Sequence, residues 1–245
     1  MKTRMRFTKT GSVKFIGHLD CMRFFQKAIR RAGLDVAYSQ GYSPHQLMSF
    51  ASPLGVGITS DGEYLDVTFH SLPESLSMAE LTGYLNQFMT DEIFITEIEI
   101  MPDTFKNSMS LLQSADYMII EKEPGIFPCD WEQKWEEFIH QPCIIVKKKT
   151  KKSEKEMDIR KHILAQATTL ESFSAQTGEL YGEIHCPYSQ GDTIFMQLTS
   201  GSETNIKPDL VMDAFYQFCH ADCPPYSYQI HRLQMYFDKI GGQKK

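Results

Sequence analysis

Hydrophobic positions follow two different periods in the first part of the chain. Met5 and Phe7 alternate with polar neighbours, which predicts a half-buried strand. Between residues 18 and 32 the apolar positions recur every three or four residues, which predicts a helix that Gly33 ends. The apolar stripe of this helix is expected to contain Leu19, Met22, Phe25, Ile29 and Ala32.

The same predicted helix carries a row of cations. Successive residues in a helix are rotated by about 100°, so the basic residues share the side opposite the apolar stripe. These residues are Arg23, Lys27, Arg30 and Arg31. We therefore expect a helix that is apolar towards the core and cationic towards solvent.

The pattern beyond this helix completes a familiar order of elements. Asp61-Gly62 lies between two apolar runs and predicts a hairpin turn, followed by a strand at residues 63–69. Ser77 and Glu80 form the sequence of a capping box and predict the start of a second helix. Residues 92–100 are expected to form a strand. The order β-α-β-β-α-β is the ferredoxin-like arrangement.

The second half shows a weaker version of the same order. We expect strands at residues 116–123, 192–200 and 226–237, a helix at 131–141, a hairpin around Ser153 and further β structure at 169–186. Pro208 suits the first turn of another helix. The predicted fold class is α+β, with two tandem ferredoxin-like (βαββαβ) modules, the second with inserted strands. Their predicted ranges are 1–101 and 116–240, joined by a linker at 102–115.

Charge is distributed unevenly along the chain. The 245 residues carry a net charge of −6, yet residues 1–45 contain nine Lys or Arg and only two acids. A second basic run at residues 147–161 has eight basic residues and three acids. Basic islands on an acidic protein favour a localised anionic partner, although a lysine-rich hairpin is also a common solvated edge.

Other features narrow the class of protein. No run of 18 apolar residues exists, so we expect no membrane span, and the N-terminus lacks the apolar core of a secretory signal. The six cysteines show no framework spacing, which favours free thiols in the cytoplasm.

Several stretches resemble one bacterial family. Residues 4–67, "RMRFTKTGSVKFIGHLDC" and onward to "EYLDV", strongly resemble the start of the radical-SAM-linked protein family. Residues 147–163 and 198–215 are similar to that family's later motifs. The resemblance implies bacterial proteins of unassigned function, encoded beside or fused to a cobalamin-binding-type radical SAM protein. Their genes often lie near those for ribosomal proteins and an RNA-processing endonuclease.

The chain lacks the CxxxCxxC run of a radical SAM enzyme, so the resemblance implies a companion of that enzyme. The pair Cys219 and Cys223 stands alone, at a predicted helix end, and we predict neither a metal site nor a cofactor. A more distant likeness, to CRISPR repeat-processing endoribonucleases, rests on paired ferredoxin-like modules and cannot establish an activity.

RNA binding is the leading functional prediction. Aromatic rings stack on unpaired bases, and Lys or Arg neutralise phosphates. The stretch "AYSQGYSPHQLMSF" supplies aromatic residues and a histidine beside the cationic helix, while the first strand adds two arginines on the open face of the sheet. The predicted RNA-binding residues are Arg4, Arg6, Arg23, Lys27, Arg30, Arg31, Tyr38, Tyr42 and His45. The two arginine sets lie on opposite sides of the module.

Alternatives accompany this prediction. Arg6 could instead pair with Asp66 across the sheet. The cationic face could dock an acidic protein without nucleic acid. The chain could also be a metal-independent endoribonuclease with His45 as a weak catalytic candidate, since His45 follows Pro44 in an irregular segment. His18, by contrast, is expected to have a capping or buried structural role. We favour an RNA-binding accessory protein that presents RNA to a radical SAM-type partner.

Overall fold

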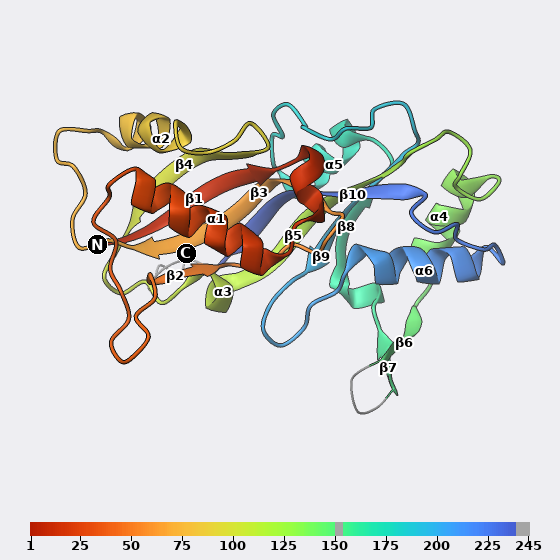
Figure 1. The fold of residues 1–245 in the computed structure, drawn as a ribbon. Helices are drawn as coiled ribbons and strands as arrows, with labels where there is room; N and C mark the ends of the chain where they lie inside the picture. The colour runs from red at the N-terminus through yellow and green to blue at the C-terminus, as the bar shows by residue number, and fades with distance from the viewer. Residues whose placement is uncertain (150–153, 239–245) are drawn as a thin grey trace. The chain divides into compact units, whose positions relative to one another are not determined.

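The computed structural model describes residues 1–149 and 154–238, which belong to two compact units (Figure 1). Unit 1 comprises residues 1–113 together with the chain from Gln234 onward, and unit 2 comprises residues 114–233. Both units combine helices with mostly antiparallel strands, so the predicted α+β class is confirmed. No helix among the described residues is long and apolar enough to cross a membrane.

Unit 1 is a sheet with its two longer helices packed on one face. Its elements are β1 (Lys2–Lys9), η1 (Gly11–Phe15), α1 (His18–Arg31), β2 (Met48–Phe50), β3 (Thr59–Thr68), α2 (Met78–Asn86), β4 (Ile93–Met101) and α3 (Ser108–Leu111). The strands lie in the order β4-β1-β3, and β2 pairs with Leu65–Val67 of β3. All these pairs are antiparallel. The inward residues Met5, Phe7 and Leu65 pack with the helices in one core.

Helix α1 forms where the sequence predicts it. Its last turn contains Arg30 and Arg31, which interact favourably with the negative end of the helix dipole. The helix then ends before Gly33, which has a φ of +68°. Phe25 and Ile29 are buried as expected, but the assignment of Leu19 to the apolar stripe is wrong. Leu19 is 62% exposed, because Cys21 and Ala28 complete the buried face and turn Leu19 outward.

Helix α2 begins with the predicted capping box. The Ser77 side chain accepts a hydrogen bond from the Glu80 amide, and the Glu80 carboxylate accepts one from the Ser77 amide. Leu81 and Leu85 are buried against the sheet. The Tyr84 hydroxyl donates to the carbonyl of Ala32 at 2.9 Å, which holds α2 against the end of α1.

The predicted hairpin turn at Asp61-Gly62 is wrong. Both residues lie inside β3, and the chain reverses instead between β2 and β3, over residues 51–58. Phe7 pairs with Glu63 while Lys9 pairs with Ser60, so β3 holds one more residue than β1 at this point. Asp61-Gly62 therefore forms part of a β-bulge, another place where short and flexible residues are favoured.

Residues 102–115, predicted to be a linker, contain defined structure. Phe105 and Ser108 are buried in unit 1, α3 follows, and β5 (Leu112–Glu121) begins at Leu112. The chain passes from unit 1 to unit 2 within this strand, after Gln113.

Unit 2 has the same mixture of elements with additions. They are the rest of β5, α4 (Trp131–Ile139), β6 (Ile145–Lys149), β7 (Glu154–Asp158), η2 (Arg160–His162), β8 (Ile163–Ala167), α5 (Leu170–Thr177), β9 (Thr193–Thr199), α6 (Pro208–Phe218) and the start of β10 (Tyr228–Phe237). The strand order is β10-β5-β9-β8. Strands β6 and β7 pair as the predicted hairpin, whose turn at Ser153 lies outside the described residues.

The predicted β structure at residues 169–186 is wrong: Leu170–Thr177 form helix α5, and residues 178–186 form no strand. Thr169 accepts a hydrogen bond from the Ser172 amide at the start, and Gly178, with a φ of +74°, ends the helix. Both are ordinary helix-end signals. Phe173 is buried against Met118 and Phe195, so tertiary packing of this one ring stabilises a helix that is only eight residues long.

Candidate functional site

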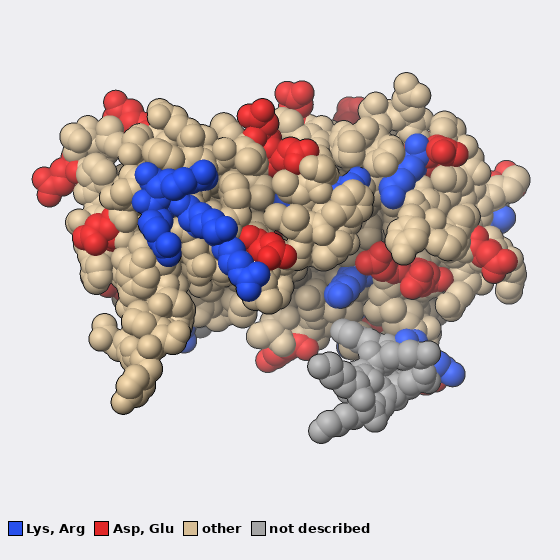
Figure 2. Space-filling view, viewed as in Figure 1, with Lys and Arg blue, Asp and Glu red and all other residues tan. Residues whose placement is uncertain are grey.

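The outer face of α1 carries the four predicted cations. Arg23, Lys27, Arg30 and Arg31 are all exposed. Figure 2 shows Lys and Arg side chains gathered over α1 in this view. Arg23 forms an ion pair with Asp20 at 3.0 Å, but both side chains are more than 60% exposed, so the pair contributes at most about 1 kcal/mol. Solvent screening leaves Arg23 available to a polyanion.

The other cations of this face differ in their engagement. Arg31 donates through Nη2 to the carbonyl of Phe88 at 2.7 Å, which fixes its side chain beside α2. Lys27 and Arg30 form no ion pair within 4 Å with any residue that the structure describes. These two residues and Arg23 therefore form the most available part of the cationic face.

A projecting loop, which we call the finger, follows α1. It comprises residues 37–47 and projects between α1 and β2 in Figure 1. Its two arms are joined by a bridge between Tyr38 and Gln46 and by a backbone bond from Leu47 to Ala37 of 2.8 Å. Tyr42 lies at the tip with its side chain fully exposed. Residues 36–60 contain no Lys, Arg, Asp or Glu, so the finger is a charge-free surface.

The base of the finger is attached to α1. Gln46 is buried, and its Nε2 donates to the carbonyl of Gln26 at 3.3 Å and to the Tyr38 hydroxyl at 3.4 Å. Gln26 lies three residues after Arg23 and four before Arg30, on the same helix. The finger and the cationic face therefore belong to one continuous region of unit 1.

His45 is exposed on the finger but is held by Ser39. The Ser39 hydroxyl lies 2.8 Å from Nδ1 of His45 and accepts a bond from the His45 amide at 3.1 Å. The Ser39 hydroxyl therefore engages one of the two ring nitrogens of His45.

Arg4 lies on the opposite face of the sheet and is engaged within unit 1. It forms an ion pair with Glu99 at 2.8 Å, and its guanidinium lies 4.9 Å from the centre of the Phe237 ring. Its side chain is only 14% exposed. These contacts leave Arg4 little surface for a phosphate.

Arg6 lies beside Arg4 and is half-buried. Its register partners are Tyr64 on β3 and Glu97 on β4. The alternative that Arg6 faces Asp66 directly is therefore wrong, because Arg4 occupies that position in the register.

A buried group of titratable side chains was missed from the sequence. Lys9 and Glu63 are buried between β1, β3 and α1, and the Lys9 ammonium donates to the carbonyl of Ile16 at 2.9 Å. Burial lowers the pKa of Lys9 and raises the pKa of the Cys21 thiol to about 12. Lys9 follows Met5 and Phe7 at steps of two, and this parity was the available signal for its burial.

The space beside this group is too small for a substrate. Its volume is about 10 Å³, room for a single water molecule, and its mouth is lined by Pro53 and by His18. His18 is the first residue of α1 and is exposed, so the expected buried or capping role for it is wrong. We interpret the group as part of the core.

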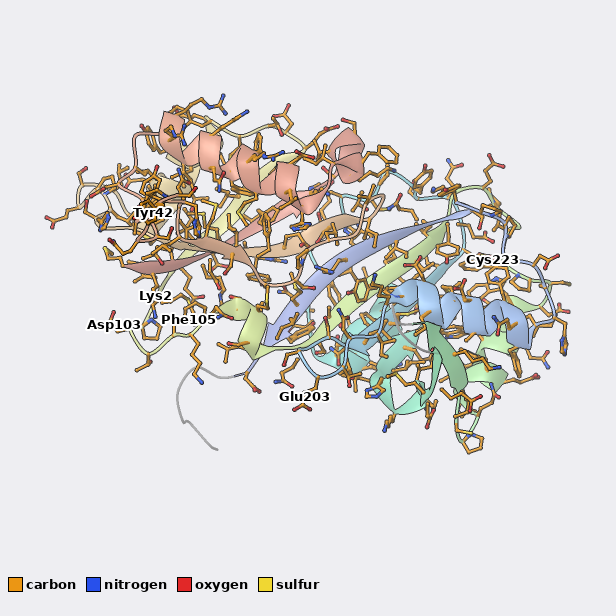
Figure 3. The ribbon with its side chains drawn as sticks, turned by 60° about the horizontal axis from the view of Figure 1, so that its bottom comes forward. Lys2, Tyr42, Asp103, Phe105, Glu203 and Cys223 are labelled. Atoms are coloured by element: carbon orange, nitrogen blue, oxygen red, sulfur yellow. The ribbon has the colours of Figure 1, made fainter. Side chains whose placement is uncertain are left out.

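A larger groove of about 290 Å³ lies on the open face of the unit 1 sheet. Its lining includes Lys2, Ser49, Asp66, Phe105 and Asn107. The Lys2 ammonium already donates to the carbonyls of Asp103 and Phe105, which Figure 3 shows beside it. Lys2 in this groove thus forms hydrogen bonds within the protein that hold β1 to the segment after β4. Tyr42, His45 and Arg30 do not line the groove.

No metal site is evident in the described part of the chain. Within those residues, no group of three His, Cys, Asp or Glu side chains is placed to hold a metal ion. Cys219 caps the end of α6 and Cys223 lies in the loop beyond it, so the two do not share a helix face.

Fold and site together describe a two-unit α+β protein that presents a cationic helix beside a charge-free aromatic finger. The chain belongs to the family described as uncharacterised proteins conserved in bacteria (DUF2344), whose model matches residues 2–208. This match includes α1 and the finger. No curated protein is similar enough to the chain to count as a relative.

Proposed function

We propose that this protein binds RNA through the cationic face of α1 and the adjoining finger, and holds it for a radical SAM-type partner. One observation carries the proposal. Arg23, Lys27 and Arg30 are exposed on one helix face that is tied, through Gln26 and Gln46, to a finger ending in a fully exposed tyrosine. Phosphates and unpaired bases are the partners that this combination fits.

Spacing supports a polyanion rather than a single anion. Arg23 and Arg30 are seven residues apart, which corresponds to about 10 Å along the helix axis. A nucleic acid backbone supplies several charges over that length, whereas a single phosphate supplies its charge at one point. Arg4 and Arg6 are left outside the proposed surface, since they lie across the sheet and Arg4 is paired with Glu99.

Salt dependence of RNA binding tests the proposal. Fluorescence anisotropy with labelled RNA should give a linear fall of log K with log salt concentration. Replacing Arg23, Lys27 and Arg30 by Gln should weaken binding and reduce that slope by about two, at roughly 0.7 per lost phosphate contact on a single strand.

A matched control variant removes the same number of positive charges from a different part of the surface. Lys106, Lys161 and Lys207 are exposed lysines outside α1, and replacing all three by Gln also removes three positive charges. This variant should keep the wild-type slope. If both triple variants lost RNA affinity to the same extent, the effect would be one of total charge and not of the α1 face. Absence of RNA binding by the wild-type protein would overturn the proposal.

The partner is proposed from the resemblance of residues 4–67 to radical-SAM-linked proteins. Purified protein, labelled RNA and a radical SAM-type protein from the same bacterium should co-elute as one complex in gel filtration. A different result would be that the triple variant loses RNA binding and still forms the complex with the radical SAM-type protein as well as the wild type does. That result would favour the alternative of a protein adaptor with an acidic partner.

Catalysis by His45 is not part of the proposal, because His45 lines neither of the two spaces described above. An RNA cleavage assay separates the two ideas. We expect no cleavage by the purified protein. Cleavage that disappears in His45→Ala would instead support an endoribonuclease.

We further propose that each unit is a ferredoxin-like module. The order β-α-β-β-α-β in unit 1, with strands β4-β1-β3-β2, supports this assignment. In unit 2 the order β10-β5-β9-β8 supports it as well, with the β6–β7 hairpin and α5 as insertions. An experimental structure with another strand order would remove this assignment.

A further inference from the structure

We propose that the bound RNA is single-stranded, and that Phe15 and Tyr42 stack on unpaired bases at opposite ends of the α1 cation row. This inference rests on the proposed RNA binding and adds the strandedness of the ligand, a second aromatic contact and the length of the site.

Phe15 is an unusually exposed aromatic residue. It ends η1, immediately before α1, and its side chain is 66% exposed. Leu19 and Val56, at 62% and 63%, are exposed as well. The amide of Gly57 bonds to the carbonyl of Lys14 at 2.8 Å, so the segment with Val56 lies against η1. Exposed apolar residues that gather in this way mark a binding surface more often than isolated ones do.

The backbone segment that carries Phe15 is also held in a defined place. Glu92 accepts hydrogen bonds from the Ser12 amide at 2.8 Å, the Ser12 hydroxyl at 2.7 Å and the Val13 amide at 3.3 Å. These bonds fix η1 against the start of β4. A backbone segment that is ordered before binding loses less freedom when a base stacks on the ring that it carries.

The order of these features along α1 defines a track. Phe15 precedes the N-terminal end of the helix, and the chain leaves its C-terminal end for the finger that carries Tyr42 (Figures 1 and 3). Arg23, Lys27 and Arg30 lie between the two. The 14 residues of α1 span about 21 Å. At about 3.4 Å per stacked nucleotide, this length matches at most about six nucleotides of one strand.

The chemistry of the two ends favours a single strand. An aromatic side chain stacks on a base only when that base has left its own helical stack. In double-stranded RNA the base faces are covered, so Phe15 and Tyr42 would contribute little and only the cations would bind. Lys14, with Nζ 5.3 Å from the centre of the Phe15 ring, adds a charge for the phosphate next to the stacked base.

The test compares fluorescein-labelled octauridine with a labelled 12-base-pair RNA duplex in anisotropy titrations. We expect the wild-type protein to bind the single strand at least about tenfold more tightly. Phe15→Ala and Tyr42→Ala should each weaken octauridine binding by roughly 5- to 150-fold, the range for one stacked base. Their salt slopes should stay at the wild-type value, because no phosphate contact is lost.

Controls separate stacking from folding defects. Tyr226→Ala removes a tyrosine of unit 2 that is 90% exposed, and it should leave octauridine binding unchanged. Phe15→Trp should restore binding, since a larger ring still stacks. Both lost rings are exposed, so the thermal unfolding midpoints of the Ala variants should match the wild type.

The outcomes distinguish the two proposals. Equal binding of strand and duplex that depends on Arg23, Lys27 and Arg30 would overturn the single-strand inference and keep RNA binding. Unchanged octauridine binding in both Ala variants would also overturn the single-strand inference and keep RNA binding. Failure to bind either RNA would overturn both, and binding of an acidic peptide that Phe15→Ala abolishes would then identify the surface as a protein-docking site.

Discussion

Ser108 donates two hydrogen bonds to the carboxylate of Asp66, from its backbone amide at 2.6 Å and from its hydroxyl at 2.7 Å. Both residues are buried in unit 1. The segment after β4 is thereby held against the C-terminal part of β3. Arg4 is the register partner of Asp66 on β1 and contributes a favourable charge.

This relationship predicts a pH-dependent contribution to stability. Burial raises the pKa of Asp66 above its usual value, although the bonds from Ser108 and the charge of Arg4 act against the shift. A carboxyl whose pKa is raised on folding favours the folded state at low pH. That contribution is complete below the unfolded pKa and is lost as pH rises through the folded pKa.

Asp66→Asn should remove this dependence, because the amide does not titrate. The measurement is the free energy of unfolding in urea at several pH values from 4 to 8, for wild type and variant. The free energy of unfolding of the wild type, relative to that of Asp66→Asn, should be highest at low pH and should fall as the pH rises. Parallel curves would show that Asp66 does not titrate differently in the folded protein. Asp66→Ala, which leaves the Ser108 donors unmatched, should cost about 1–3 kcal/mol.

The thiols should differ in reactivity according to burial. Cys21 is buried and burial raises its pKa to about 12, so little thiolate exists at pH 8 and a reagent cannot reach it. Cys129 and Cys143 are exposed. Iodoacetamide followed by mass spectrometry should show these two alkylated in the native protein and Cys21 alkylated only after unfolding in urea. Rapid native alkylation of Cys21 would contradict its position in the core.

Two phenylalanines on and beside α1 should have opposite effects on stability. Phe25 is buried and its ring lies 4.8 Å from that of Phe7, so Phe25→Ala should cost about 3–5 kcal/mol. Phe15→Ala should change the free energy of unfolding by no more than about 0.5 kcal/mol. Urea denaturation measures both. A large loss for Phe15→Ala would show that its exposed ring packs in solution.

Gly191 lies where unit 2 has no room for a side chain. A Cβ there would be 2.4 Å from the carbonyl oxygen of Glu121, and the next residue, Asp192, bonds through its amide to the Glu121 carboxylate. Gly191→Ala should therefore cost about 1–3 kcal/mol, because backbone must move.

Gly182→Ala is the matched control, since no atom lies within 4 Å of a Cβ at that position. We expect no loss there and a gain of up to about 1 kcal/mol, because Ala restricts the unfolded chain. Thermal or urea unfolding measures both variants. If Gly191→Ala were as stable as Gly182→Ala, residue 191 could not lie in close contact with Glu121 of β5.

Local signals in the sequence were sufficient wherever neighbours along the chain decide the structure. The period of three to four residues and Gly33 predicted α1, and Ser77 with Glu80 predicted the start of α2. The four cations of α1 were placed correctly on its outer face for the same reason, since helix geometry fixes which residues share a side. Tyr42 was likewise predicted to be available, from an irregular segment rich in Gly, Pro and Ser.

The sequence by itself thus determined the elements, the α+β class and the cationic helix face of this protein. Only the tertiary structure decided that Asp61-Gly62 is a bulge and that Arg4 pairs with Glu99. Each of these depends on the register between strands far apart in the chain, which no local pattern specifies. The exposure of Phe15 and Leu19 has the same origin, because whether an apolar side chain is covered depends on which distant segments reach it.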